Sequence, residues 1–243
     1  MVITSLNNDK IKELIKLKER KNRKKSEEFL VEGRHLVVEA CKKGIVKEII
    51  LEENASFITD IPTVYVSSDV MNKLSDMESP SDIMALCSLL DNEMFGERFV
   101  LLDDIQDPGN LGTIIRSALA FNVDTIVLSP NTVDLYNPKV IRATQGMMFH
   151  INIVIDELES VINDLKKKKI PVYGTNVNAG KDVSKINDID TSKYALIMGN
   201  EGNGVRQEIL DMCDDYLHIK MNKKVESLNV GVATSIILYE LNK

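Results

Sequence analysis

From Phe99 onward the sequence alternates apolar strand-like segments, polar loops and amphipathic helices, and this alternation constrains the fold more than any other feature. Such an order is typical of an α/β domain in which helices cover both faces of a mostly parallel sheet. Six strands are expected, at Phe99–Asp103, Thr125–Leu128, Ile151–Ile155, Pro171–Thr175, Tyr194–Met198 and Tyr216–Ile219. The sequence also predicts helices at Leu111–Phe121, Pro138–Thr144, Glu157–Lys168, Val205–Met212 and Leu228–Leu241.

A smaller α/β domain is expected before this sheet, because 243 residues suit one small and one medium domain. Its predicted helices are residues 8–25, Arg34–Lys43 with Gly44 as the C-terminal cap, and Asp69–Leu74. Its predicted strands are Phe29–Val31, Glu48–Leu51, Thr63–Val66 and Ile83–Leu89. The polar stretch Asp91–Glu97 is the linker candidate. The expected domains are therefore residues 1–92 and 98–243.

The composition indicates a globular protein without membrane spans or metal sites. The longest apolar runs have the length of a strand, well below the ~18 residues that cross a bilayer. Lys and Glu interrupt the N-terminal segment, so no apolar signal core is expected and the cytoplasm is the predicted location. The cysteines and histidines are scattered without the spacing of metal ligands: Cys41, Cys87, Cys213, His35, His150 and His218.

The charge is distributed unevenly along a chain whose formal net charge is -7. The first 25 residues carry nine basic and three acidic side chains, a net of +6, which leaves -13 for the rest. A solvated helix face is the plain interpretation. The alternative is a phosphate-binding element, whose Lys and Arg side chains release counterions when they bind nucleic acid. Lys21, Arg23, Lys24 and Lys25 are the candidate RNA contacts under that alternative.

Chemistry in an open α/β sheet is expected in the loops that follow the strands, and three of these loops are unusual. The first runs from Asp107 to Arg116 and places Asn110 near the start of a helix. Arg116 lies within reach of the same loop, although a surface salt bridge would also explain it. The second, residues 199–204, has three glycines around Glu201, which is hard to explain as a plain turn.

The third loop leads into the last helix, where Ser227 is the predicted N-cap and small residues follow Asn229. The glycine spacing of the second loop matches neither GxGxxG nor GxxxxGK, so dinucleotide and ATP binding are both disfavoured.

In this order and spacing, the three loops resemble motifs 1, 2 and 3 of the SpoU or TrmH-like branch of the SPOUT RNA methyltransferases. The segments 134–139 and 142–146 also resemble that family, and the N-terminal part is similar to its small RNA-substrate-binding domain. The resemblance implies a C-terminal trefoil knot, a homodimer and the transfer of a methyl group from S-adenosyl-L-methionine (AdoMet) to a ribose 2'-hydroxyl of structured RNA.

The resemblance also assigns roles to individual residues. It implies a catalytic constellation of Asn110, Arg116, Glu201, Ser227 and Asn229. In it, Asn110 and Asn229 would orient the ribose and Arg116, and Glu201 would hold Arg116 or the loop. The cofactor contacts that it implies are Thr175, Gly199, Ile219, Met221 and Leu228. Arg116 is nominated to activate the hydroxyl, but a guanidinium is a very weak base and is better suited to stabilise a developing alkoxide.

Two other functional classes stay open on the sequence. A catalytically silent RNA-binding factor for ribosome assembly would keep the basic arm without needing Arg116, Glu201 and Asn229. A nucleotide-dependent oxidoreductase would suit the architecture but lacks the glycine fingerprint. Ribosomal RNA is favoured over transfer RNA because of the separate N-terminal domain, and no residue specifies a nucleotide.

Overall fold

The computed structural model describes residues 2–176, 180–186 and 189–243, which form two compact units. The first unit holds the chain up to Asp91 together with Asp134–Phe149. The second unit holds Asn92–Val133 and His150–Lys243. The segment Asp134–Phe149, which falls within the expected domain 98–243, is therefore grouped with the N-terminal residues.

In the described part of the first unit, a five-stranded mixed sheet forms the centre. Its order is β1 (Val2–Ile3), β4 (Thr63–Val66), β3 (Val46–Glu52), β5 (Ile83–Ser88) and β2 (Glu28–Glu32). The β1–β4 and β3–β4 pairs are parallel, whereas β5 is antiparallel to β2 and β3. The sequence did not predict the two-residue strand β1, which is too short to show a pattern.

The helices of the first unit largely follow the sequence prediction, with one correction. They are α1 (Asp9–Lys16), α2 (Arg20–Ser26), α3 (Arg34–Lys43), α4 (Ser68–Leu74), α6 (Pro138–Thr144) and the 3-10 helix η1 (Met147–Phe149). The predicted helix 8–25 is two helices, because the chain turns at residues 17–19. Leu17 continues the apolar face of α1 into the core, where Ile11 and Leu14 pack with Met71 of α4.

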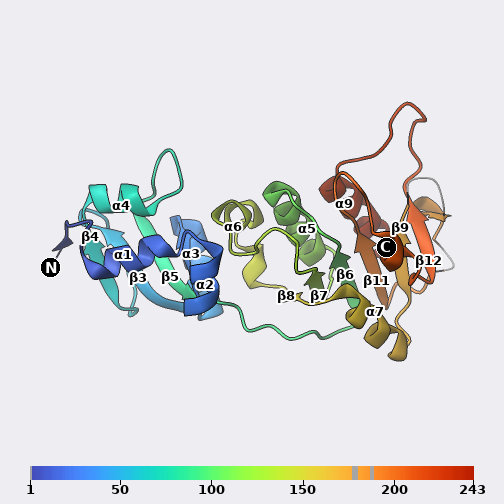
Figure 1. The fold of residues 1–243 in the computed structure, drawn as a ribbon, viewed down its shortest axis with the longest axis horizontal. Coiled ribbons are helices and arrows are strands. Elements are labelled where there is room, and N and C mark those ends of the chain that lie inside the picture. The colour runs from blue at the N-terminus through green and yellow to red at the C-terminus, as the bar shows by residue number, and fades with distance from the viewer. Residues whose placement is uncertain (1, 177–179, 187–188) are drawn as a thin grey trace. The chain divides into compact units, whose positions relative to one another are not determined.

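The second unit is built on a parallel sheet of seven strands in its described part (Figure 1). Its order is β10 (Lys181–Asp182), β12 (Asp215–His218), β9 (Val172–Thr175), β11 (Tyr194–Met198), β6 (Arg98–Leu102), β7 (Thr125–Leu128) and β8 (Asn152–Ile155). Every pair in this order is parallel. The six predicted strands are all present within one or two residues, and the short β10 is the addition.

Helices cover both faces of this sheet, as predicted. On one face, Leu158, Ile162 and Leu165 of α7 (Leu158–Lys167) pack against Phe99 and Leu101 of β6. Side chains alternate along a strand, so Val100, which lies between Phe99 and Leu101, points to the opposite face of the sheet. There α5 (Pro108–Ala120) and α9 (Val230–Leu241) lie side by side (Figure 1).

The remaining helical elements of the second unit are the short α8 (Gln207–Leu210) and the 3-10 helix η2 (Val183–Lys185). The helix α5 begins three residues before its predicted start, because the Asp107 carboxylate accepts a hydrogen bond from the Asn110 N–H at 2.8 Å. Asp107 is thus the N-cap, and Pro108 occupies the first turn, where its missing N–H costs nothing.

The packing of α5 against α9 fixes the two helices that carry the candidate site. A Cβ added to Gly231 would lie 3.1 Å from the Thr113 side chain, so a small residue is needed where the helices are closest. One turn further on, the hydroxyls of Ser117 and Ser235 are 2.6 Å apart. The start of α5, with Asn110, is therefore held near the start of α9.

Candidate functional site

The three unusual loops meet at the carboxyl end of the parallel sheet. They follow β6, β11 and β12, and β6 and β11 are direct neighbours in the sheet. An open pocket of about 490 Å³ lies between the second and third of these loops. This volume is in the range of pockets that bind small molecules and cofactors, which is about 300–1,000 Å³.

All five residues predicted to bind the cofactor line this pocket: Thr175, Gly199, Ile219, Met221 and Leu228. Three of the predicted catalytic residues, Glu201, Ser227 and Asn229, line it too. The chain thus brings together residues that lie 54 positions apart in the sequence, from Thr175 to Asn229. Asn110 and Arg116 are outside the pocket lining.

The loop after β11 forms one wall of the pocket with its backbone. Asn200 and Gly204 exchange two backbone hydrogen bonds of 3.0 and 2.9 Å, which close the loop on itself. A Cβ on Gly199 would lie 2.1 Å from the carbonyl carbon of Gly204, so only glycine fits there. Gly204 has a φ of +70°, in the left-handed region that favours glycine. The pocket wall is therefore backbone that a ligand can approach closely.

Glu201 connects this loop to the loop after β6. Its carboxylate accepts hydrogen bonds from the backbone N–H groups of Gln106 and Asp107, both at 3.1 Å, and from Asn110 Nδ2 at 2.9 Å. Burial raises the pKa of Glu201, but the hydrogen bonds from the Asn110 side chain and these backbone groups outweigh it, and the net pKa is lowered. The carboxylate is thus held ionised as an acceptor.

Asn110 and Asn229 extend this contact to the third loop. Asn229 Nδ2 donates to Asn110 Oδ1 at 2.7 Å, and Asn229 Oδ1 accepts from the Val232 N–H at 3.2 Å. A carboxylate only accepts hydrogen bonds, so it turns the Asn110 amide group toward itself. The orientation of each following amide is set in turn, and the three loops are joined through Glu201, Asn110 and Asn229.

Two details of the predicted site need correction. The N-cap of α9 is Asn229, whose side chain bonds the Val232 N–H, and not Ser227. Ser227 is exposed on the loop before the helix and lines the pocket. Asn110 and Asn229 bond each other, and neither is bonded to Arg116. Glu201 was expected to hold either Arg116 or the loop, and in the structure it bonds the loop after β6.

Arg116 lies exposed on α5, and no hydrogen bond or ion pair joins it to any residue that the structure describes. It follows Asn110 by six residues, which is somewhat less than two helical turns. Its guanidinium is therefore free of protein partners among the described residues.

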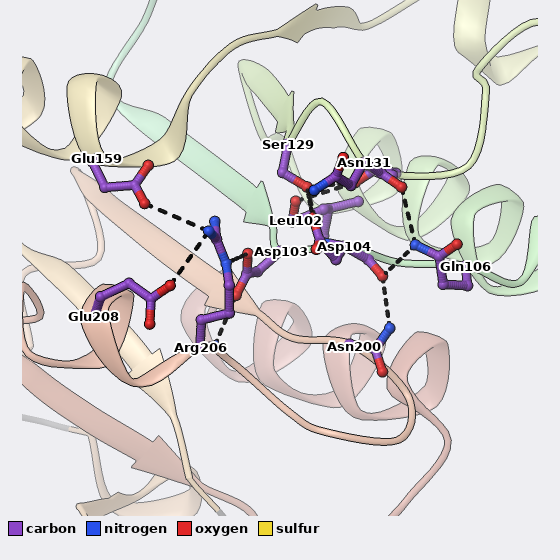
Figure 2. A network of polar contacts seen from close by, with 11 residues as sticks. Leu102, Asp103, Asp104, Gln106, Ser129, Asn131, Glu159, Asn200, Arg206 and Glu208 are labelled. Atoms are coloured by element: carbon purple, nitrogen blue, oxygen red, sulfur yellow. Dashed lines mark hydrogen bonds and ion pairs between the residues drawn. The ribbon is translucent and has the colours of Figure 1, made fainter.

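A second set of polar residues, which the sequence pattern did not indicate, lies beside the pocket (Figure 2). Asp103 is fully buried, and its carboxylate accepts from both the backbone N–H and Nε of Arg206 at 2.8 Å. Asn200 Nδ2 donates to the carbonyl of Asp104 at 2.8 Å. The available signal was an acidic residue directly after a buried strand, which the pattern assigned to the strand itself.

The predicted RNA contacts divide into two kinds. Lys21, Lys24 and Lys25 are exposed on α2. Arg23 is only 5% exposed, and its guanidinium donates to the carbonyls of Leu17 and Lys18 and pairs with Asp134. The prediction that Arg23 contacts RNA is therefore wrong: its charge is already used to hold the turn between α1 and α2.

Two further findings concern metals and membranes. Among the residues that the structure describes, no three His, Cys, Asp or Glu side chains are grouped so as to hold a metal ion. In the same residues, no helix is long and apolar enough to cross a bilayer.

Comparison with protein families identifies the arrangement. The profile of the SpoU rRNA Methylase family matches residues 97–239, which include all three loops. The chain belongs to the SpoU rRNA methylase family. The profile of the MRM3-like substrate binding domain matches residues 8–85 of the same chain. The expectations of AdoMet as cofactor and of methyl transfer to an RNA ribose are thus confirmed at the level of the family.

Individual relatives cover the whole chain. The 23S rRNA (guanosine(2553)-2'-O)-methyltransferase RlmP of Bacillus subtilis (strain 168) is 40% identical over 245 residues, which cover 98% of each chain. An AdoMet-bound rRNA methyltransferase from Sinorhizobium meliloti has a TM-score of 0.86 at 27% identity, covering 99% of this chain and 97% of that one. The SpoU methyltransferase AviRb from Streptomyces viridochromogenes, in complex with AdoMet, has a TM-score of 0.85 at 25% identity and covers 97% of both chains.

Proposed function

We propose that this SpoU-family protein methylates the ribose 2'-hydroxyl of a guanosine in 23S rRNA. The observation that carries the proposal is the contact of Glu201, Asn110 and Asn229, which joins three loops beside a pocket of cofactor size. The RNA target is supported by the similarity to RlmP, which covers 98% of both chains.

The pocket fits AdoMet in its chemistry. Backbone of residues 199–205 forms one wall, and Ile219, Leu228 and Ile237 supply apolar surface for a flat base. His218 adds a polar side chain to the lining of the pocket. Thr175, Gly199, Ile219, Met221 and Leu228 would hold the cofactor.

The residues around the pocket would orient and activate the ribose. The sulfonium of bound AdoMet supplies an electrophilic methyl group, and no metal is needed. The Arg116 guanidinium would stabilise the alkoxide that develops on the 2'-oxygen. Glu201, Asn110 and Asn229 would fix the three loops relative to one another. Ser227 would contact the substrate from the pocket rim.

The same proposal includes the knot, the homodimer, the roles of the two domains and the location in the cell. The loops around residues 199–229 would form the trefoil knot of the SPOUT fold, and two chains would associate as a homodimer. Residues 1–92 would bind RNA and residues 98–243 would catalyse the transfer, and the protein would act in the cytoplasm. Lys21, Lys24 and Lys25 would contact RNA phosphates.

Ribose methylation mapped in total RNA tests the proposal, because a 2'-O-methyl group protects the adjacent phosphodiester from alkaline hydrolysis. Cells with and without the gene are compared, and the Arg116→Ala variant serves as the inactive control. We expect one protected guanosine in 23S rRNA to be lost with the gene and not to be restored by the variant. Loss in transfer RNA instead would contradict the target, and an unchanged pattern would favour a silent assembly factor.

A further inference from the structure

The loop that lines the pocket is attached at both ends to one buried residue, Asp103. At the start of the loop, the Asp103 N–H donates to the carbonyl of Met198 at 2.9 Å. At its end, the Asp103 carboxylate accepts from the backbone N–H and Nε of Arg206, each at 2.8 Å. Residues 199–205 thus form a closed segment: the Asp103 N–H fixes its start, and the Asp103 carboxylate fixes its end through Arg206, as Figure 2 shows.

The burial of Asp103 makes this attachment energetically selective. Its carboxylate is 0% exposed, and a buried charge is tolerated only where it is paired and hydrogen-bonded. Arg206 provides a donor for each carboxylate oxygen, its backbone N–H for Oδ2 and its Nε for Oδ1. The same guanidinium also lies 3.6 Å from Glu159 and 3.5 Å from Glu208, which are beyond hydrogen-bond distance and far more exposed than Asp103. The short contacts to Asp103 therefore decide where Arg206 sits.

A second row of contacts fixes the strand end to which the loop is attached. Asp104 has a φ of +58°, an uncommon conformation for a residue other than glycine. Ser129 Oγ holds it there by donating to its carboxylate at 2.6 Å and accepting from its N–H at 2.9 Å. The turned backbone presents the Asp104 carbonyl to Asn200 Nδ2 at 2.8 Å and to Gln106 Nε2 at 2.9 Å.

We propose that Asp103 and Arg206 are positioning residues for methyl transfer, which fix the loop 199–205 so that Glu201 meets Asn110. This inference rests on the proposed function and deepens it, because it names what holds the three-loop contact in place. The two residues would affect methyl transfer through Glu201. Its carboxylate can accept from Gln106, Asp107 and Asn110 only if the loop 199–205 keeps its position relative to the end of β6. Neither Asp103 nor Arg206 lines the pocket, so neither needs to touch the substrate.

The test is Asp103→Asn, with the double variant Glu159→Gln and Glu208→Gln as the matched control. The amide keeps the shape of the carboxylate but places an N–H group against one of the two Arg206 donors. The control removes the two other carboxylates that form ion pairs with the same guanidinium and leaves the Asp103 contacts intact. Hydrogen exchange by mass spectrometry, AdoMet binding by calorimetry and kcat at saturating AdoMet and rRNA are measured for each.

In Asp103→Asn we expect faster exchange confined to residues 103–110 and 199–206, weaker AdoMet binding and a kcat lowered by about a hundredfold. Affinity for rRNA and exchange in the strands β7 and β8 should stay at the wild-type level, as should every measurement for the control. Wild-type exchange at these segments with wild-type kcat would overturn the proposal, and so would equal losses in the control.

A second variant keeps the test decisive if Asp103→Asn fails to fold. Arg206→Ala retains the buried carboxylate and the backbone N–H at position 206, so one of the two contacts survives. The same local exchange and a comparable loss of kcat are expected, because the buried carboxylate loses its charged partner, and unchanged exchange at residues 199–206 would overturn the proposal. Exchange and AdoMet binding do not depend on turnover, so they test these two residues even if the wild-type protein transfers no methyl group to rRNA.

Discussion

A single carboxylate, that of Glu201, connects the loop after β11 to the start of α5, and its replacement tests the candidate site directly. Glu201→Gln puts an amide N–H where three donors now converge. Hydrogen bonds to a charged group are worth about 1.5–3 kcal/mol, so we expect kcat to fall by roughly tenfold to a hundredfold. Steady-state kinetics measure it. Glu226→Gln, an exposed acid in the loop before α9, is the control, and equal loss there would contradict the role of Glu201.

Arg116 is exposed and has no partner among the described residues, and its replacement tests its proposed role in catalysis. We expect Arg116→Ala to abolish methyl transfer and to leave AdoMet binding nearly unchanged, because Arg116 does not line the pocket. Arg116→Lys should fail as well, since an ammonium cannot reproduce a planar, bidentate guanidinium. Transfer of labelled methyl and calorimetry measure the two quantities. Near wild-type turnover in Arg116→Ala would remove the catalytic assignment.

Arg23 differs from its basic neighbours because it serves the fold of the first unit. Arg23→Ala leaves the buried carboxylate of Asp134 and the carbonyls of Leu17 and Lys18 without their donor. Loss of one partner of a buried pair costs about 3–5 kcal/mol, so the free energy of unfolding should fall by that order. Urea denaturation measures it, with the exposed Lys24→Ala as control. A change below about 1 kcal/mol, the upper range for surface pairs, would contradict the structural role.

At the scale of elements, the sequence predicted strands and helices wherever the apolar period was long enough. The helix Arg34–Lys43 and its cap Gly44 occur as predicted, because the cap is a local property of glycine at a φ of +79°. The break in the basic segment after Lys16 was missed, since Leu17 extends the apolar spacing of α1 without a breaker residue. The turn is held by Arg23, which donates to the carbonyls of Leu17 and Lys18 and pairs with the distant Asp134, which no local pattern contains.

The exposed lysines of α2 form the element whose role in RNA binding can be measured. Lys21, Lys24 and Lys25 changed together to Ala should weaken rRNA binding and lower the slope of log affinity against log salt by about 0.7–0.9 for each lost contact. Turnover at saturating rRNA should change little. The matched control is Lys42, Lys43 and Lys47, which are exposed lysines of the same unit. A salt slope equal to that of the wild type would return α2 to a solvated helix face.

At the scale of the whole molecule, the part that sequence could not supply is the association of distant segments. Residues 134–149 lie between β7 and β8 in the chain, and the alternation of strand and helix gave no reason to separate them from the sheet. They belong to the first unit through contacts such as that of Tyr136, whose hydroxyl accepts from the Leu90 N–H at 2.9 Å. Likewise, the resemblance to a known family predicted Asn110, Glu201 and Asn229, whereas Asp103 and Arg206 became visible only once the fold had paired β6 with β11.

The proposed homodimer can be tested on α9, because this helix leaves apolar side chains exposed to solvent. Val232 and Tyr239 are 46% and 53% exposed on a helix that otherwise packs against α5. If α9 faces a second chain, light scattering at micromolar concentration should give twice the 27.3 kDa of one chain. Tyr239→Glu should then shift the protein toward the monomer, because association would bury the new charge. Phe95→Glu is the matched control, since Phe95 is 56% exposed outside α9. A wild-type monomer, or equal dissociation in the control, would contradict an interface through α9.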